Sequence, residues 1–393
     1  MCECMSFYGI GKDYFEKKGC THTSSEIAQQ PRIWRELGDM LLEKKDDISA
    51  FMGKAYGAGQ LRIVLTGAGS SGYVGDALAA LAAKSAGIRA ESVHTTDIVS
   101  DPEAHLFPDV TTLLISVARS GNSPESVGAV KYARSIVKNL FEIAIVCNGK
   151  SDLYNLTAQS ERSMVLLMPE GANDEGFAMT SSVSAMLLAG FALFNAGKID
   201  GIVSDIGLLS QRMADESLKF TEVASKWAER DFDRVAYLGS GFLKHIAHEA
   251  SLKIMELTNG TVNGSCESAT GFRHGPKTVI KDKTLTVHLV SSDLFTARYD
   301  MDLLSEVCKE KKQNMAIAIG AGPWDGIPVD EAITVPADGF GIGAGICTGL
   351  QSLVFCQMLA MFKSLALGIG TDNPSPTGEV NRVVKGVTVY DLQ

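Results

Sequence analysis

Two patterns of apolar residues alternate along most of the chain. Short apolar runs of strand length are separated by longer segments whose apolar positions follow a helical period. The strand-like runs begin near Leu61, Arg89, Thr111, Phe141 and Met164. Strands that alternate with helices predict βαβ units, and therefore an α/β fold with a parallel sheet covered by helices.

The segment before the first strand-like run has a helical pattern. Thr23-Ser-Ser-Glu26 is a capping-box sequence, which predicts the start of a long amphipathic helix that continues to about Met52. We expect Pro31 to interrupt this helix, because proline removes one backbone hydrogen bond.

The second half of the chain repeats the order of the first half. Val235–Gly241 matches Val64–Gly69, and Leu285–Val290 matches Leu113–Val117, at a nearly constant offset. Later strand-like runs and a long apolar helix follow in the same order. We therefore expect two copies of one flavodoxin-like or Rossmann-like unit. The predicted divisions are an N-terminal helical segment over 1–50, domains over 51–210 and 211–372, and a tail over 373–393.

Composition narrows the class of protein. Of the 393 residues, 45% are hydrophobic and 21% are charged, which is typical of a soluble globular protein. The net charge of −10 argues against a nucleic-acid partner. The eight cysteines show no metal-binding spacing, and no apolar run reaches the length of a membrane span without polar interruption. We therefore expect a cytoplasmic protein without a membrane partner.

A glycine-rich turn follows the first strand-like run. Thr66–Gly72 satisfies the spacing G-x-G-x-x-G between a strand and a helix, which is a nominal dinucleotide fingerprint. The acid expected further on is poorly matched, since Glu91 begins a strand-like segment. Ser70 and Ser71 instead offer hydroxyl groups at a helix N-terminus. A nicotinamide site, a turn without a ligand and an anion site all stay open for this motif.

The stronger candidate for an anion site follows the run at Thr111. Ser120, Gly121 and Ser123 lie between a predicted strand and a helix that begins near Pro124, and Arg119 adds positive charge. Backbone N–H groups and the helix dipole favour a phosphate there. The alternative is an ordinary polar loop. Further hydroxyl groups at Thr180 and Ser181 precede another apolar helix, where capping and binding explain them equally well.

Titratable residues concentrate in the second copy. Glu249, Lys253 and Glu256 fall on one narrow helical face, and His274 follows within Gly-Phe-Arg-His-Gly-Pro. Taken alone, the first three residues are also compatible with a surface ion pair. The nearby pair of histidines in His245-x-x-His248 lacks a third ligand, so we expect no metal site.

Together these motifs resemble the sugar isomerase (SIS) family of phosphosugar-binding domains over residues 50–390. The Ser120–Ser123 segment is similar to that family's phosphate loop, with Ser70 and Ser71 at the companion turn. The Glu249–Pro276 region and the tail around Lys385 are similar to the isomerase half of glucosamine-6-phosphate synthase. The leading segment Glu26–Glu36 is typical of the galactosamine-6-phosphate deaminase group, also named tagatose-6-phosphate ketose/aldose isomerase.

The resemblance implies two tandem SIS-type domains and an enzyme that acts on a small sugar phosphate without a cofactor. Glu256 would be the general base and acid, and His274 would open the sugar ring. Lys253 would assist Glu256, and Lys385 would act from the tail. Phosphate would bind at Ser70, Ser71, Arg119, Ser120, Gly121 and Ser123, with Thr180 or Ser181 as further candidates.

The resemblance also implies a homodimer in which His274 serves the neighbouring subunit's site. The expected reaction converts galactosamine 6-phosphate into tagatose 6-phosphate and ammonia. Plain ketose–aldose isomerisation, glucosamine-6-phosphate deamination and non-catalytic phosphosugar sensing stay open. Two features differ from the synthase: the charged Arg119 and the longer segment between Glu256 and His274.

Overall fold

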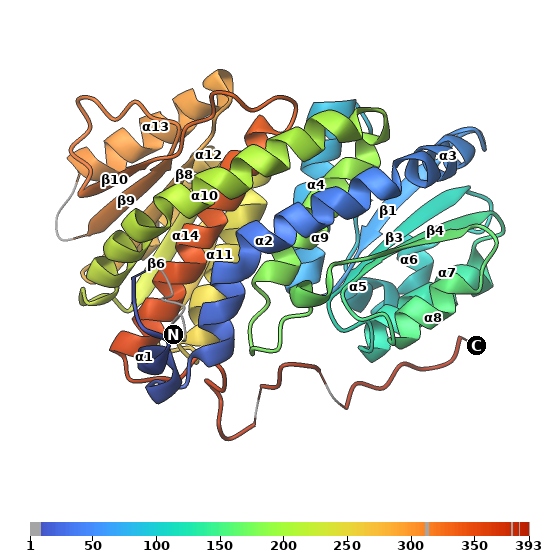
Figure 1. Ribbon diagram of the computed structural model, residues 1–393, viewed down its shortest axis with the longest axis horizontal. Helices are drawn as coiled ribbons and strands as arrows, with labels where there is room; N and C mark the ends of the chain where they lie inside the picture. The colour runs from blue at the N-terminus through green and yellow to red at the C-terminus, as the bar shows by residue number, and fades with distance from the viewer. Residues whose placement is uncertain (1–8, 311–313, 379, 385, 393) are drawn as a thin grey trace, which may run out of the picture. The chain divides into compact units, whose positions relative to one another are not determined.

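The chain forms two compact units, each built around one sheet (Figure 1). The computed structural model describes residues 9–310, 314–378, 380–384 and 386–392. The first-sheet unit contains Arg32–Asp174, Ser181–Ser204 and Gly378–Gln393. The second-sheet unit contains Met1–Pro31, Glu175–Thr180 and Asp205–Thr377. Two long helices, α2 (Thr21–Glu43) and α10 (Ile199–Ala228), pass from one unit into the other.

The first sheet is entirely parallel, with strand order β2-β1-β3-β4-β5. Its strands are β1 (Arg62–Thr66), β2 (Glu91–Ser92), β3 (Thr112–Ala118), β4 (Leu140–Val146) and β5 (Ser163–Leu167). The other helices of this unit are α3 (Lys45–Tyr56), α4 (Ser70–Ala86), α5 (Thr95–Ser100), α6 (Pro102–His105), α7 (Pro124–Ile136), α8 (Asp152–Ala158) and α9 (Ser181–Phe194), with short 3₁₀ turns η1 (Glu170–Ala172) and η2 (Ala196–Lys198).

The second sheet is also parallel, with order β10-β9-β8-β6-β7. Its strands are β6 (Arg234–Gly239), β7 (Asn263–Glu267), β8 (Thr284–Val290), β9 (Met315–Gly320) and β10 (Glu331–Thr334). The remaining helices are α1 (Lys12–Lys17), α11 (Phe242–Leu257), α12 (Ala269–Phe272), α13 (Leu294–Lys309) and α14 (Ala344–Ala366), with the 3₁₀ turn η3 (Pro276–Val279). Two five-stranded parallel sheets flanked by helices confirm the predicted α/β class.

Burial explains why the central strands read as continuous apolar runs. Every residue of β3 and of β8 is buried, as expected for parallel strands that helices cover on both faces. On one face of the first sheet, side chains of β1, β3 and β4 form one core cluster with α5, α7 and α8, which includes Leu114, Ala129 and Leu153. On the same unit, α4 packs against α9, which is buried along its whole length.

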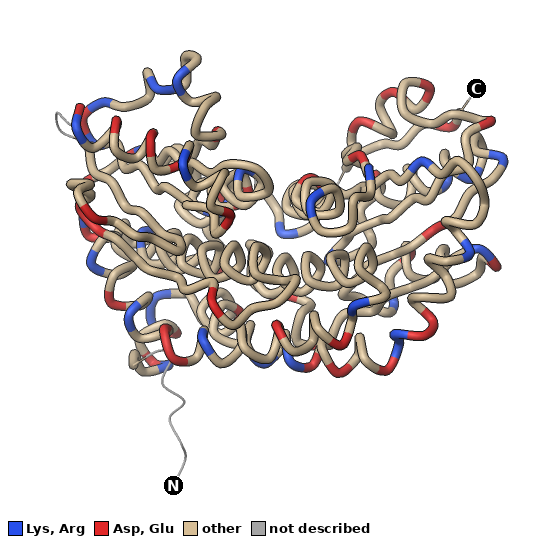
Figure 2. Tube along the Cα trace, turned by 90° about the horizontal axis from the view of Figure 1, so that it is seen from above, with Lys and Arg blue, Asp and Glu red and all other residues tan. Residues whose placement is uncertain are grey.

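Helix α14 is long and apolar enough to cross a membrane, yet it lies inside the second-sheet unit. Its most apolar window of 18 residues is 94% buried within the protein, which is typical of a core helix. Lys, Arg, Asp and Glu are interspersed along the trace of both units (Figure 2). The net negative charge is therefore distributed along the chain.

The predicted interruption at Pro31 is wrong. Pro31 lies inside α2, which continues to Glu43, and the break before α3 falls at Lys44. A proline at this position leaves the carbonyl group of Ile27 without its usual helical donor. The side chain of Gln30 compensates, because its Nε2 donates to the Ile27 carbonyl oxygen at 3.2 Å.

Candidate active site

The loop that follows β3 is held in a fixed conformation. Gly121 has a φ of +63°, and a Cβ there would lie 2.8 Å from the Cβ of Ser151. The Gly121 carbonyl accepts from the backbone N–H of Leu153 at 3.0 Å, and the Ser120 carbonyl accepts from Asn148 Nδ2 at 3.3 Å. Ser123 then precedes α7, whose first residue is Pro124. Glycine is required at 121, and the loop presents its hydroxyl groups at a helix N-terminus.

The turn after β1 lies beside this loop in the sheet. Strand β1 lies between β2 and β3 in the sheet. The chain runs from β1 to β2 on one side and then crosses back to β3 on the other side of β1. Their carboxyl ends therefore form the topological switch point at which open α/β sheets bind ligands. Ser70 and Ser71 begin α4 at this point, and both are buried. The structure thus places both predicted phosphate-binding segments on adjacent strand ends.

Glu91 has a different role from the acid of a dinucleotide site. Its carboxylate forms a 2.5 Å ion pair with Arg62, the first residue of β1. The acid of a dinucleotide site follows the strand end and faces the ligand. Here the residue that follows β2 closely is His94, whose Nε2 lies 3.3 Å from Asp76 Oδ2. The geometry of these residues therefore favours the anion-binding interpretation of the Thr66–Gly72 turn.

Thr180 and Ser181 are both fully buried. The carboxylate of Asp174 accepts from the backbone N–H groups of Ser181 at 3.2 Å and Ser182 at 2.9 Å, and it also bonds both hydroxyl groups. Asp174 therefore caps α9. A phosphate at this helix start would face that carboxylate, so the Asp174 charge disfavours phosphate binding at Thr180 and Ser181. The sequence signal for Asp174 was an acid shortly before paired serines and an apolar helix.

Helix α11 carries the Glu249, Lys253 and Glu256 cluster. The Lys253 side chain is completely buried, and its Nζ lies 3.3 Å from Glu249 Oε1 and also contacts Glu256 Oε2. Glu249 is 2% exposed, whereas the Glu256 side chain is 25% exposed. The alternative of a surface ion pair is therefore wrong. Glu256 is the member of the cluster that a ligand can reach.

The electrostatics of Lys253 follow from that packing. Burial alone lowers the pKa of the Lys253 ammonium group, but the neighbouring Glu249 and Glu256 carboxylates more than offset this effect and raise the pKa above its ordinary value. Lys253 therefore stays protonated and holds the Glu256 carboxylate on one side. A fixed cation beside a partly exposed carboxylate suits general acid–base chemistry.

His274 lies in an exposed turn between α12 and η3. The segment is anchored by the buried Phe272 and by ion pairs from Arg273 and Lys277 to Glu306. Within the described chain, no hydrogen bond or ion pair joins the His274 side chain to Glu256. The structure therefore presents His274 to solvent on a fixed turn, and does not bring it into contact with the α11 cluster.

The tail crosses the first-sheet unit. Arg119 Nη2 donates to the Arg382 carbonyl oxygen at 2.8 Å, and the Arg382 guanidinium donates to the Asp174 carbonyl oxygen. Val389 packs against the core cluster of α5, α7 and the sheet. Lys385 lies outside the described residues. Sequence reasoning did not single out Arg382, because its contacts join segments far apart in the chain.

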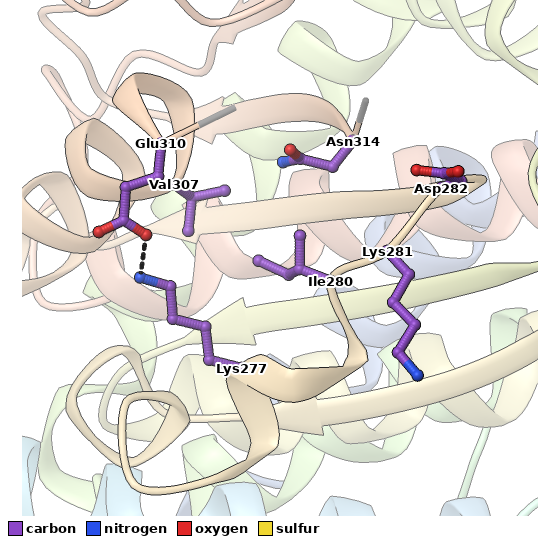
Figure 3. Close-up of a pocket in the computed structure, with 7 residues that line it drawn as sticks. All are labelled: Lys277, Ile280, Lys281, Asp282, Val307, Glu310 and Asn314. Atoms are coloured by element: carbon purple, nitrogen blue, oxygen red, sulfur yellow. Dashed lines mark hydrogen bonds and ion pairs between the residues drawn. The ribbon is translucent and has the colours of Figure 1, made fainter. Parts of the chain in front are cut away.

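The second-sheet unit also contains a cavity, which shares Lys277 with the anchored turn of His274. This cavity has a volume of about 230 Å³. Its lining residues, drawn in Figure 3, are Lys277, Ile280, Lys281, Asp282, Val307, Glu310 and Asn314. Its lining residues flank the amino ends of β8 and β9, at the edge opposite to the one where parallel sheets bind ligands. Among the described residues, no group of three or more His, Cys, Asp or Glu is placed to hold a metal ion.

Comparison with known proteins identifies the family. Residues 58–196 match the SIS domain. The D-galactosamine-6-phosphate deaminase AgaS of Shewanella sp. ANA-3 is 39% identical over 97% of this chain and 95% of its own length. The protein of that name from Escherichia coli is 37% identical over 95% of this chain and 96% of its own. The chain belongs to the AgaS family. The predicted SIS and deaminase-group resemblance is therefore confirmed.

Solved structures agree with this assignment. A Clostridium novyi protein, provisionally named a tagatose-6-phosphate ketose/aldose isomerase, has a TM-score of 0.93 and 38% identity, over 98% of this chain and 99% of its own. The Escherichia coli tagatose-6-phosphate ketose/aldose isomerase gives 0.85 and 34%, over 95% and 97%. The C-terminal domain of glucosamine-fructose-6-phosphate aminotransferase from Francisella tularensis gives 0.74 at 16% identity, over 89% and 97%, and shows the shared fold. The fold of two SIS-type domains is thus the one predicted.

Proposed function

We propose that this AgaS-family chain is an aminosugar-phosphate deaminase that converts galactosamine 6-phosphate and water into tagatose 6-phosphate and ammonia. The structural observation that carries the proposal is a partly exposed Glu256 carboxylate held by the fully buried ammonium group of Lys253. The near full-length similarity to proteins named D-galactosamine-6-phosphate deaminase supports the choice of substrate.

Phosphate binding is assigned to the first-sheet unit. Ser70 and Ser71 at the start of α4, and Ser120, Gly121 and Ser123 before α7, supply hydroxyl and backbone N–H donors at adjacent strand ends. Binding energy from the remote phosphate group would orient C1 and C2 of the sugar for reaction. Arg119 belongs to the predicted set as well, and its side chain also contacts the tail.

Proton transfer is assigned to Glu256. In the open-chain substrate, the Glu256 carboxylate removes the proton from C2 and the C1 oxygen takes up a proton from water, so that the C1 aldehyde and C2 amine become an enaminol. The protonated Glu256 then delivers the proton to C1, leaving a ketimine at C2. Water adds to this imine and ammonia leaves, which gives the ketose. Lys253 keeps the Glu256 carboxylate oriented and stabilises its charge.

His274 and Lys385 receive auxiliary roles. The His274 imidazole opens the pyranose ring by moving a proton between the anomeric hydroxyl group and the ring oxygen. Its exposed position suits action on the site of a neighbouring subunit, and we propose a homodimer on this basis. Lys385 would assist from the tail, either electrostatically or through a transient imine with the open-chain sugar.

We further propose an internal duplication of the SIS unit and a cytoplasmic location.

A second candidate function is ketose–aldose isomerisation without loss of ammonia. It is favoured by the structural similarity to proteins named tagatose-6-phosphate ketose/aldose isomerase. The same Glu256 proton transfer between C2 and C1 performs that reaction when C2 carries oxygen in place of nitrogen. A phosphosugar sensor is less consistent with the buried Lys253 beside Glu256.

The test incubates the purified protein with galactosamine 6-phosphate, glucosamine 6-phosphate and tagatose 6-phosphate, and measures ammonia and sugar products. We expect ammonia from galactosamine 6-phosphate. Glu256→Gln should lower turnover at least about 1,000-fold with sugar-phosphate binding retained, and Glu222→Gln on the exposed face of α10 should have no effect. Isomerisation without ammonia release from either aminosugar would favour the second candidate. Persistent turnover in Glu256→Gln would remove Glu256 as the base.

A further inference from the structure

The C-terminal tail is attached to the first-sheet unit at two places. Near its end, Val389 packs into the core cluster so closely that a Cβ on Gly128 would lie 2.8 Å from Val389 Cγ1. There the Tyr132 hydroxyl group also donates to the Tyr390 carbonyl oxygen. Earlier in the tail, the backbone of Arg382 is held by Arg119. The two attachments lie on either side of residue 385.

Arg119 joins the tail to the loop that follows β3. It stands between Ala118, the last residue of β3, and Ser120, the first hydroxyl residue of the loop. Its side chain is 6% exposed, and its Nη2 donates to the Arg382 carbonyl oxygen at 2.8 Å. Hydrogen bonds from charged donors are among the stronger ones in proteins, and a buried charged donor is costly to leave without an acceptor. Arg119 and the docked tail therefore stabilise each other.

The side chain of Arg382, in the tail, also contacts the first-sheet unit. The Arg382 guanidinium donates to the backbone carbonyl of Asp174, whose carboxylate caps α9 through Ser181 and Ser182. Arg382 is therefore tied through its carbonyl to the end of β3 and through its side chain to the segment before α9. This double attachment fixes the tail at residue 382 more firmly than a single backbone contact would.

We propose that Arg119 is a positioning residue that docks the C-terminal tail beside the phosphate loop, and that it influences turnover through the tail. The inference rests on the proposed function in one respect, namely that the tail contributes to the reaction. It differs from the sequence-based role of Arg119, in which the guanidinium binds the substrate phosphate. The two roles predict different kinetic changes. Loss of a phosphate ligand raises KM, with or without a fall in kcat, whereas loss of a tail anchor lowers kcat and leaves KM nearly unchanged.

Tail docking can be measured without catalysis. Trypsin cleaves after Arg382 and Lys385, and cleavage of a segment that opens and closes quickly follows the population of its open form. Arg119→Ala in the full chain should speed release of the C-terminal peptide about 10-fold or more, as loss of a charged hydrogen bond implies. Arg162→Ala, an exposed arginine of the same unit that contacts Asn139 and Phe141, is the matched control and should release the peptide at the wild-type rate.

Kinetics then separate the two roles of Arg119. We expect Arg119→Ala to lower kcat about 10-fold while KM for the sugar phosphate changes less than about 3-fold. Val389→Asp, which detaches the other end of the tail, should lower kcat similarly. The double variant should be no slower than the slower single variant, since both changes act through one segment. Thermal melting of each variant shows whether the rest of the chain is folded.

The outcomes are distinct. A rise in KM well above about 3-fold, with or without a change in kcat, would assign Arg119 to the phosphate and overturn the proposal, as would effects that multiply in the double variant. An unchanged rate of peptide release in Arg119→Ala would also overturn it. If the protein released no ammonia but Arg119→Ala still freed the tail, the docking role would stand and the proposed deaminase function would fail.

Discussion

Lys253 is an ammonium group with no exposed surface, held between two carboxylates on its own helix. A charge removed from water is stable only when partners replace its hydration, and Glu249 is nearly as buried as Lys253. The buried charge of each of these two residues therefore depends on the opposite charge of the other. Glu256 differs, because its partial exposure lets water or a ligand replace the ion pair.

We predict that Lys253→Met destabilises the protein by about 3–5 kcal/mol, because it leaves the Glu249 carboxylate buried without its cation. The double variant Lys253→Met/Glu249→Leu should recover most of this loss. Lys244→Met, which removes a more exposed ion pair with Glu267 from the same helix, should cost less than about 1 kcal/mol. Urea unfolding monitored by circular dichroism measures all three. A loss for Lys253→Met as small as that for Lys244→Met would contradict the buried-pair account.

His94 provides a prediction about pH. The hydrogen bond to Asp76 raises the pKa of His94, and burial of the ring opposes this increase. The negative charges of Asp76 and Asp97 raise the pKa further. Tyr73 packs beside the imidazole ring. A raised pKa in the folded state gives stability that is complete below about pH 6.5 and is lost as pH rises through the folded pKa. NMR titration should therefore place the pKa of His94 above 6.5 and lower it in Asp76→Asn. The stability difference between the two proteins should be larger at pH 5.5 than at pH 9; no dependence on pH would refute this role.

At the scale of elements, the contact between α4 and α9 depends on one glycine. Gly190 lies in the middle of the buried helix α9, and a Cβ there would overlap the side chain of Leu78 and come within 2.9 Å of its Cδ2. Leu78 is itself completely buried and has little room to move. The close approach of α4, which begins at Ser70, therefore requires glycine at 190.

Gly190→Ala should accordingly destabilise the first-sheet unit by about 1–3 kcal/mol through overpacking. Leu78→Ala in the same chain should relieve the overlap, so that the double variant is less destabilised than the sum of the two single variants. Gly207→Ala, at an exposed position of α10, is the matched control. Its Cβ meets nothing within 4 Å, and alanine should stabilise the helix by about 0.5–1 kcal/mol. Calorimetric melting compares the four variants, and an unaffected Gly190→Ala would show that α9 can shift away from Leu78.

Elements that depend on local pattern were predictable from the sequence. The strand at Leu61–Leu65, the glycine turn and the helix after it correspond to β1, the 67–69 turn and α4. The expected strand from Arg89 to His94 is much shorter, since β2 covers only Glu91 and Ser92 at the sheet edge. Edge strands bury fewer apolar side chains, so their pattern carries less information.

Long-range polar contacts were not predictable. The helix continues through Pro31 because Gln30 reaches the Ile27 carbonyl and also bonds Gln357, a partner 327 positions away. Asp174 acts as a cap because the fold brings it against Ser181 and Ser182. Helical spacing and the family resemblance identified Glu256 and Lys253 as candidates. Their burial, which separates an active-site pair from a surface pair, required the packing of α11.

At the scale of the whole molecule, the central question is whether the active site of one subunit includes residues of another. His274 is exposed on an anchored turn, and the described chain shows no bond between its side chain and Glu256. A symmetric dimer would place two copies of each residue at equivalent positions, so that each site could combine groups from both subunits. The homodimer is a proposal, and its consequence is measurable.

Co-expression of Glu256→Gln and His274→Ala subunits tests this sharing. Each variant alone should be inactive. If each site takes Glu256 and His274 from different subunits, a mixed dimer contains one intact site, and random assembly should restore about a quarter of the wild-type activity per subunit. Two affinity tags isolate the mixed species. Inactive mixed dimers would show that both residues serve the site from the same subunit.

The tail attachments have a consequence for synthesis on the ribosome. All five strands of the first sheet are translated before residue 168, whereas Arg382 and Val389, which dock on that unit, follow the whole second sheet. The nascent first-sheet unit can therefore assemble its sheet early, but the contact that Arg119 makes with the tail can form only after both sheets have been translated. Formation of this contact thus marks a late stage in the maturation of the chain.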